Sequence, residues 1–222
     1  MSDAAPEPLA SLSIEAFQAE AGIDDAALAR LRVYADTLID WNGRMNLVSP
    51  NSLIDLWRRH MLDSTQLVKL IPETARRHID IGSGAGFPGL VIAALLGPGV
   101  GLETILIEAI EKKCAFLRAA VTAMGLEHHV TVVRGRAEEV SLEKADLVTA
   151  RAVAPLVSLL FYSRRLVAKG GICLFPKGRT AADELTEARR SWTIKAEMIP
   201  SLSDPSAAII AIQSFGTKGR RS

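Results

Sequence analysis

The chain has little cysteine and no long hydrophobic run. Its 222 residues include two cysteines, Cys114 and Cys173. Two thiols exclude a disulfide framework or a metal cluster, so we expect small core residues in a reducing compartment. The N-terminus has neither a basic start nor an apolar run, which argues against a signal peptide. The uncharged, mostly apolar stretch 87–102 is short for a membrane span and contains Gly97-Pro98-Gly99. We therefore expect a soluble cytoplasmic protein with no membrane contact.

Net charge is also small, but it is unevenly distributed. The chain carries a formal net charge of +1, and 49% of its residues are hydrophobic, enough for a sizeable core. Residues 1–75 hold 6 Lys and Arg against 11 Asp and Glu, whereas the rest holds 20 against 14. The basic larger part suits a polyanion bound on one face, although surface composition alone explains it equally well.

The first third of the chain is predicted to be helical. Residues 1–12 form a tail rich in Pro, Ala and Ser, and Asp24 is expected to cap the first long helix. Its apolar stripe consists of Leu28, Leu31, Ala35, Leu38 and Met45. A second helical stretch covers 52–71, and Asp63-Ser64 could cap a fresh start within it.

Beyond residue 75, short β-branched runs alternate with amphipathic segments. Strands are expected at 78–81, 104–108, 130–133, 147–149 and 172–175, with helices at 88–96, 111–124, 155–168 and 181–190. Such alternation indicates βαβ units and a parallel sheet. Runs 193–199 and 207–213 are too close for a crossover helix, so they should form an antiparallel hairpin. We expect one structural domain and a monomer, with a helical extension (1–75), an α/β core (76–215) and a disordered basic tail (216–222).

The segment Asp80-Ile-Gly-Ser-Gly-Ala-Gly-Phe-Pro-Gly89 follows the first strand directly. Gly82, Gly84 and Gly86 allow the backbone to turn sharply and to approach a ligand closely. The run matches the dinucleotide pattern G-x-G-x-x-G, which alone is weak. Its form, beginning at an acidic residue, looks like the first motif of class I methyltransferases. There, Asp80 could meet the α-ammonium of S-adenosylmethionine directly or through water.

Glu108 ends the second predicted strand. A carboxylate there can accept hydrogen bonds from both ribose hydroxyls, whether the ligand is a dinucleotide or S-adenosylmethionine. A structural role is the alternative, but carboxylates at buried strand ends are rare without partners. The glycine loop and Glu108 together predict a nucleoside ligand.

Several separated signatures resemble one family, the small-subunit rRNA 7-methylguanosine methyltransferase G, formerly glucose-inhibited division protein B. They are Trp41-Asn42, Asn46-Leu47, Arg59-His60, Asp63-Ser64, Asp80 to Gly89, Glu108, Lys112-Lys113, Phe116-Leu117, Arg136-Ala137-Glu138, Arg151-Ala152 and Lys177-Gly178. The resemblance runs from about residue 30 to 215. It implies a Rossmann-like sheet of seven strands, mostly parallel, closed by an antiparallel hairpin and preceded by a helical extension. Implied cofactor contacts are Gly82, Phe87, Ala137, Glu138 and Arg151.

The resemblance implies methylation of a guanosine in the decoding-site loop of 16S rRNA, on the small subunit or a precursor. The 7-position nitrogen of guanine has a free lone pair, so no general base is required. Arg151 and His60 are the candidate catalytic residues, and no metal is expected. His60 is alternatively a packing or phosphate-contacting residue. Candidate RNA contacts are Lys112, Lys113, Arg136, Lys177, Arg179 and Arg59, with Lys177 foremost because it follows the fifth strand.

Three other functions are compatible with parts of the sequence. An NAD-dependent oxidoreductase would need a proton relay such as Tyr-x-x-x-Lys, and neither Tyr34 nor Tyr162 has a lysine four positions on. A non-catalytic RNA-binding module is disfavoured by the intact glycine loop and Glu108. A methyltransferase acting on a protein, a small molecule or another RNA is opposed only by the signatures outside the glycine loop.

Overall fold

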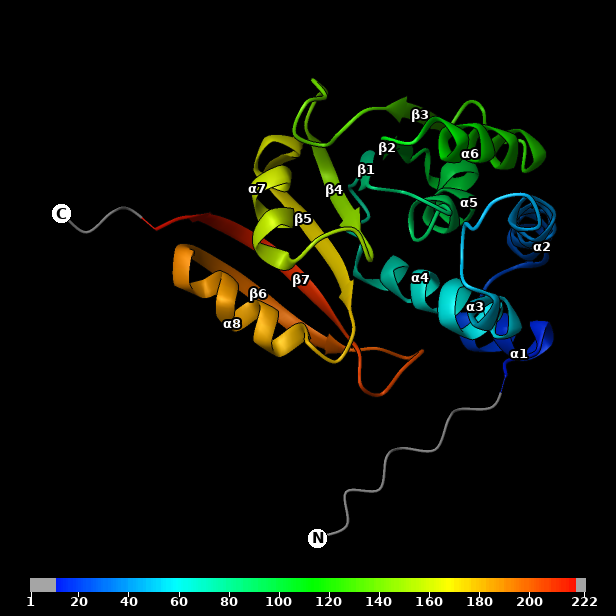
Figure 1. The fold of residues 1–222 in the computed structure, drawn as a ribbon, viewed down its shortest axis with the longest axis horizontal. Helices are drawn as coiled ribbons and strands as arrows, with labels where there is room; N and C mark the ends of the chain where they lie inside the picture. Colours follow the sequence, from blue (N-terminus) through cyan, green and yellow to red (C-terminus); the bar gives the residue numbers. More distant parts are fainter. Residues whose placement is uncertain (1–10, 219–222) are drawn as a thin grey trace, which may run out of the picture.

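A seven-stranded sheet forms the centre of the computed structural model, which describes residues 11–218 (Figure 1). The strands are β1 (Arg77–Ile81), β2 (Glu103–Glu108), β3 (Val130–Arg134), β4 (Ala145–Ala150), β5 (Val167–Lys177), β6 (Trp192–Pro200) and β7 (Ala208–Thr217). Their order is β3-β2-β1-β4-β5-β7-β6. β1 to β5 run parallel, and β7 is antiparallel to both β5 and β6. The predicted parallel sheet with a closing hairpin is therefore confirmed.

Helices cover both faces of this sheet. α5 (Gly89–Val100) and α6 (Glu111–Ala123) lie on one face, and α7 (Leu156–Leu166) and α8 (Ala181–Ser191) on the other (Figure 1). Leu90, Leu106 and Leu117 belong to the first apolar core, whereas Leu160 and Phe175 belong to the second. The predicted core cysteines are confirmed, because Cys114 in α6 and Cys173 in β5 are both fully buried.

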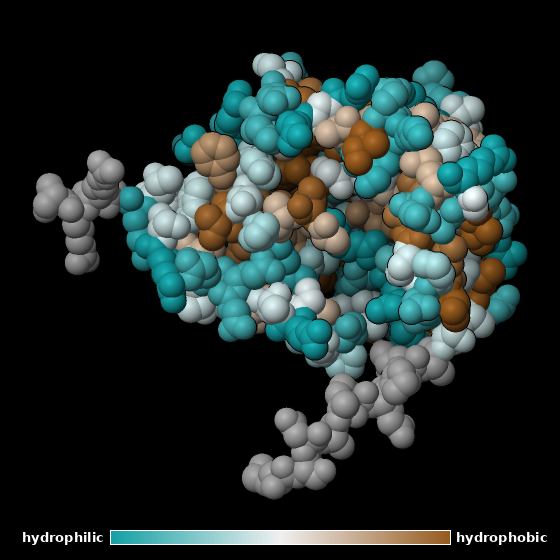
Figure 2. All heavy atoms as spheres, viewed as in Figure 1, coloured by the Kyte–Doolittle hydropathy of each residue, from teal (hydrophilic) through white to brown (hydrophobic). Residues whose placement is uncertain are grey.

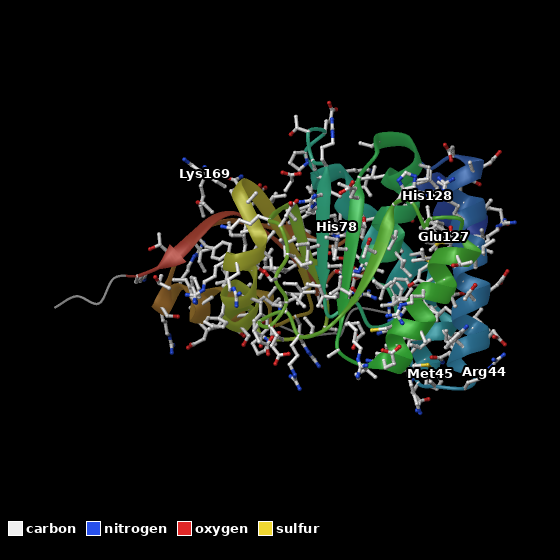
Figure 3. All side chains as sticks on the ribbon, turned by 90° about the horizontal axis from the view of Figure 1, so that it is seen from above. Arg44, Met45, His78, Glu127, His128 and Lys169 are labelled. Atoms are coloured by element: carbon white, nitrogen blue, oxygen red, sulfur yellow. The ribbon has the colours of Figure 1, made fainter. Side chains whose placement is uncertain are left out.

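Two helices open the described chain, α1 (Ile14–Ala21) and α2 (Asp25–Asn42). Asp24 caps α2 as predicted, its carboxylate accepting a hydrogen bond from the amide of Ala27 at 2.7 Å. The predicted stripe was wrong at its last member. Met45 lies in the turn beyond the end of α2, labelled in Figure 3, because the helix stops at Asn42. α2 packs against α5 and α6 and so joins the extension to the core.

The second helical stretch is irregular. It comprises α3 (Pro50–Ile54), a π-helical turn η1 (Trp57–Leu62), α4 (Asp63–Thr65) and a 3₁₀ segment η2 (Gln66–Leu70). The predicted cap at Asp63-Ser64 was wrong, since the residue before α4 is itself helical and Asp63 makes no capping hydrogen bond. Its carboxylate pairs instead with Arg151.

The expected basic tail begins later than predicted. Gly216 and Thr217 belong to β7, where they pair with Thr193 and Trp192 of β6. Residues 1–10 and 219–222, which include most of both predicted tails, lie outside the described part of the chain.

Candidate active site

Two adjoining cavities open at the carboxyl ends of the parallel strands, where the strand order reverses between β1 and β4. The glycine-loop cavity, of about 720 Å³, lies among the loops after β1, β2, β3 and β4. The hairpin cavity, of about 1020 Å³, lies between the helical extension and the β6–β7 loop. Figure 2 shows this face of the molecule hollowed near its centre. Both cavities are lined by Ser52, His60, Arg151, Ala152, Val153 and Ala154.

The glycines of the loop after β1 have different structural roles. Gly82 and Gly84 line the glycine-loop cavity, whereas Gly86 does not. At Gly82, φ is +65° and a Cβ would lie 2.3 Å from Cγ2 of Val153. At Gly86, φ is +95° and a Cβ would lie 2.5 Å from Cδ1 of Leu90 and 2.7 Å from the Tyr34 hydroxyl. Gly86 is therefore needed for packing beneath the loop rather than for contact with a ligand.

Asp80 is fully buried and does not line the cavity. Its Oδ1 accepts a hydrogen bond of 2.6 Å from the Thr149 hydroxyl, and burial raises its pKa to about 6. A Cβ on Gly89 would meet Oδ2 at 2.7 Å, so the carboxyl group lies against the start of α5. The expected direct contact between Asp80 and a ligand ammonium does not fit this position.

Glu108 lies at the edge of the glycine-loop cavity, at the end of β2. Its Oε2 accepts a hydrogen bond from the amide of Gly84 at 3.0 Å, and its Oε1 accepts one from the amide of Ile110 at 2.8 Å. A carboxylate offers about four lone-pair directions, so each oxygen can accept one more hydrogen bond. These two amides fix the carboxylate in an orientation that suits a pair of ribose hydroxyls.

The far end of the same cavity is lined by Arg136, Ala137 and Glu138, which follow β3, and by Tyr162 of α7. An adenine ring would meet a peptide segment, a carboxylate and an aromatic ring there. The cavity thus combines a glycine turn, a fixed carboxylate and a base-sized end. These residues fit S-adenosylmethionine.

Arg151 lies on the border between the two cavities and is held on several sides. One terminal nitrogen donates to Asp63 Oδ2 and to the Arg59 carbonyl, each at 3.0 Å, and the other donates to His60 Nδ1 at 2.8 Å. The guanidinium also lies 5.0 Å from the centre of the Phe87 ring, onto which His60 stacks. Arg151 is therefore immobilised beside Phe87 at the point where the cavities meet.

The hydrogen bond from Arg151 and the burial of His60 determine the protonation state of this histidine. An arginine can only donate hydrogen bonds, so His60 Nδ1 accepts and Nε2 carries the proton. Burial, with the charges of Arg151 and Arg59, lowers the pKa of His60 to about 3. His60 is consequently neutral near pH 7, and neither ring nitrogen has a free lone pair. Action as a general base, which the sequence left open, does not fit the structure.

The family model described as GidB, rRNA small subunit methyltransferase G, matches residues 27–210. The chain belongs to the GidB family. Two proteins named "Ribosomal RNA small subunit methyltransferase G" resemble it over most of their length. The one from Paramagnetospirillum magneticum is 48% identical over 90% of this chain and 95% of its own. The one from Rhodospirillum centenum is 47% identical over 96% of this chain and 95% of its own.

Solved structures share the fold of this GidB-family chain. An O-methyltransferase from Bacillus cereus in complex with SAH superposes with a TM-score of 0.57, at 15% identity over 91% of this chain and 100% of its own. Cofactor-bound Rv0187 from MTB superposes with a TM-score of 0.58, at 19% identity over 93% and 99%. The expected class I methyltransferase fold is confirmed, and S-adenosylmethionine is the cofactor of the family.

The six side chains expected to contact RNA are not equivalent. Arg59 lines the hairpin cavity, and Lys113 and Arg136 line the glycine-loop cavity. Lys112 and Arg179 are exposed but line neither cavity.

Lys177, the foremost RNA candidate, is already engaged within the protein. Its Nζ donates to Glu184 Oε2 and to the Ala154 carbonyl, both at 2.8 Å, and the side chain is 9% exposed. Lys177 also lines the hairpin cavity, but Glu184 neutralises its charge and two of its three ammonium hydrogens are engaged, which disfavours a phosphate contact. Lys177 instead ties β5 to α8 and to the loop after β4.

Sequence reasoning missed the cluster around Asp63. Asp63 Oδ1 accepts hydrogen bonds from Ser203 at 2.8 Å, Gln66 at 3.0 Å and Ser201 at 3.3 Å. The two serines lie in the β6–β7 loop, far from Asp63 in sequence. No spacing pattern connects them. The sequence indicated only Asp63 itself, as part of a family signature, and it was interpreted as a helix cap.

Among the described residues, no helix has both the length and the apolar character needed to cross a bilayer. The same part of the chain contains no group of three or more His, Cys, Asp and Glu side chains arranged to hold a metal ion.

Proposed function

We propose that this protein transfers the methyl group of S-adenosylmethionine to the 7-position nitrogen of a guanosine in the decoding-site loop of 16S rRNA. Membership of the GidB family supports the substrate, and the paired cavities support the reaction. The observation that carries the proposal is that the glycine-loop cavity and the hairpin cavity share a border. A methyl donor in the glycine-loop cavity and an acceptor in the hairpin cavity would meet beside His60, Arg151 and the loop that follows Arg151.

The cofactor contacts follow from the lining of the glycine-loop cavity. Glu108 binds the ribose hydroxyls, and Ala137 and Glu138 bind the adenine end. Gly82 and Gly84 let the backbone approach the methionine part, and Arg151 with Phe87 closes that end beside the acceptor. When bound, S-adenosylmethionine supplies an electrophilic methyl group on a sulfonium centre. The protein's part is to align donor and acceptor, since positioning accounts for much of the barrier reduction in such displacements.

The charges around the border suit an acceptor that needs no base. Guanine becomes cationic when its 7-position nitrogen is methylated, so further positive charge nearby would oppose the reaction. His60 is neutral because burial lowers its pKa to about 3. Arg151 is paired with Asp63 in an ion pair whose side chains are 16% and 12% exposed. Neither residue therefore adds an uncompensated charge at the border.

The target base must leave its stack to reach the methyl group, which favours loop or single-stranded RNA. Arg59 on the lining of the hairpin cavity, and Lys113 and Arg136 on the lining of the glycine-loop cavity, are the proposed phosphate contacts. An rRNA substrate supports a cytoplasmic location. The monomeric state and the role of residues 1–12 stay predictions.

The decisive test incubates the purified protein with tritiated S-adenosylmethionine and small ribosomal subunits from cells lacking the corresponding gene. We expect label in 16S rRNA at one guanosine, with strand scission there after borohydride and aniline treatment. Glu108→Ala should abolish labelling through lost cofactor affinity. Glu111→Ala, a nearby exposed carboxylate, should not. Cofactor binding without RNA labelling would refute the substrate and return protein or small-molecule acceptors to consideration.

A further inference from the structure

The hairpin cavity is built from parts that are distant in sequence. The helical extension contributes Asp63, the loop after β4 contributes Arg151, and the β6–β7 loop contributes Ser201 and Ser203. Its volume of about 1020 Å³ is at the upper end of the range of about 300–1000 Å³ usual for small-molecule sites. A flipped nucleotide with its flanking phosphates would fit such a space.

A single carboxylate joins these three parts. Asp63 Oδ2 lies 3.0 Å from the Arg151 guanidinium, while Oδ1 accepts hydrogen bonds from Ser203 and Ser201. The Asp63 side chain is 12% exposed, so its charge is largely removed from water. Burying a charged pair costs free energy unless it is well bonded, and here both carboxylate oxygens are satisfied.

The β6–β7 loop is held at a second point by Gln66 of η2. The amide of Leu202 donates to Gln66 Oε1 at 2.8 Å, and Gln66 Nε2 donates both to Asp63 Oδ1 and to Ser201 Oγ. Ser203 is buried at 8% exposure although it lies in a hairpin loop. The loop is thus docked onto the helical extension through a set of polar hydrogen bonds.

We propose that the hairpin cavity receives the acceptor nucleoside and that Asp63 is its positioning residue. Asp63 holds Arg151 at the border with the cofactor and docks the β6–β7 loop as the opposite wall. This inference rests on the proposed function and assigns its acceptor site. The acceptor must lie in a space continuous with the donor cavity, and the hairpin cavity shares six lining residues with it. Arg59 on the same lining provides charge for the phosphates of the target strand.

The test separates loop docking from cofactor binding. The double variant Ser201→Ala/Ser203→Ala removes the serine hydrogen bonds to Asp63 and Gln66, and leaves the Leu202–Gln66 bond and the Asp63–Arg151 pair in place. Ser206→Ala is the matched control, because its hydroxyl bonds only to Asp204 within the same loop. We expect the double variant to raise the KM for undermethylated small subunits about tenfold, since several hydrogen bonds are lost. The Kd for S-adenosylhomocysteine, measured by calorimetry, should change by less than about twofold, as should both values for Ser206→Ala.

The variant Asp63→Asn tests the role of the Asp63–Arg151 ion pair at the border between the two cavities. This change leaves Arg151 without its counter-charge, so we expect kcat to fall as well as the KM for the subunits to rise. If the double variant proves unstable in urea unfolding, Ser203→Ala alone gives the same comparison with a smaller effect. An unchanged KM, or a Kd for S-adenosylhomocysteine that rises as much as the KM, would overturn the inference. Failure of the proposed function would look different, because the unaltered protein would then methylate no RNA.

Discussion

At the scale of single residues, the loop after β1 shows that neighbouring glycines are required for different reasons. Gly84 lines the glycine-loop cavity, and a Cβ there would approach nothing closer than 3.7 Å. Gly86 faces inward, where the Tyr34 hydroxyl donates a hydrogen bond to the Ala85 carbonyl beside it. The sequence motif treats the two alike, but the structure places Gly84 on the cavity wall and Gly86 against packed side chains.

We therefore expect Gly86→Ala to destabilise the protein more than Gly84→Ala. At Gly86 the added methyl group clashes with Leu90 and Tyr34, so the loss should be about 2–4 kcal/mol. At Gly84 the loss should be about 1–2 kcal/mol, from the positive φ alone. Gly84→Ala should instead weaken binding of S-adenosylhomocysteine. Urea unfolding and calorimetry measure the two effects, and equal destabilisation by both substitutions would contradict this division.

Lys177 gives a second prediction at this scale. Lys177→Ala leaves the partly buried Glu184 carboxylate without its counter-charge, so the free energy of unfolding should fall by about 2–4 kcal/mol. Arg179→Ala, on the exposed side of the same turn, should change stability by less than about 0.5 kcal/mol. If Lys177→Ala raised only the KM for RNA and left stability unchanged, the phosphate contact first expected from the sequence would be restored.

Residue roles were predictable where one short segment determines them. Glu108 ends β2 and lines the glycine-loop cavity, as its position in the sequence indicated, because strand ends meet at one edge of a parallel sheet. Asp63 and Ser203 were not predictable as a pair, since 140 residues separate them. Their contact depends on how the hairpin folds back onto the helical extension. The ion pair between Lys177 and Glu184 was not predictable for a similar reason, because Glu184 reaches Lys177 only after α8 has packed.

At the scale of elements, hydrophobic periodicity predicted the strands, the core helices and the helical stretch at 52–71, but not the irregular geometry of that stretch. A π-helical turn accommodates more residues per turn than an α-helix, so the apolar spacing there does not follow a 3.6-residue period. β7 also continues through Gly216 and Thr217, because its backbone pairs with β6 and Phe215 packs against Trp192. Backbone pairing with a neighbouring strand can thus extend a strand beyond the end that its own amino-acid types predict.

The start of α2 offers a test of an element that the sequence did determine. Asp24→Ala removes the side-chain acceptor for the Ala27 amide, so we expect a loss of about 1 kcal/mol in the free energy of unfolding. Asp36→Ala, on the exposed face of the same helix, is the control and should cause a change of less than about 0.5 kcal/mol. Equal effects in urea unfolding would mean that the cap does not stabilise α2.

At the scale of the whole molecule, a chain of buried polar groups crosses the centre of the sheet. His78 of β1, labelled in Figure 3, contacts the hydroxyls of Thr104 at 3.3 Å and Thr149 at 2.7 Å. Thr149 in turn donates to Asp80, which lies beneath the glycine loop. Burial lowers the pKa of His78 to about 3 and raises that of Asp80 to about 6. The global stability of the fold is thereby linked to pH.

These groups have opposite effects as pH falls. Between about pH 3 and their ordinary pKa of 6.5, unfolded His60 and His78 bind protons that the folded protein does not, so acid destabilises the fold. Between its ordinary pKa of 3.8 and about 6, folded Asp80 holds a proton that the unfolded chain lacks, so acid relieves the cost of burying its charge. Near pH 5, protonation of the two histidines in the unfolded chain therefore lowers the free energy of unfolding, and protonation of the one carboxyl group in the folded protein raises it.

We expect the free energy of unfolding to fall below pH 6.5 with a slope near pH 5 of about one proton, or about 1.4 kcal/mol per pH unit. Urea unfolding at pH 7, 6 and 5 measures this slope. Asp80→Asn removes the opposing carboxyl group, so the slope of that variant should rise to about two protons. A wild-type stability that stays constant from pH 6.5 to 5 would show that the histidines are not held neutral. An unaltered slope in Asp80→Asn would show that Asp80 is already ionised in the folded protein at pH 5.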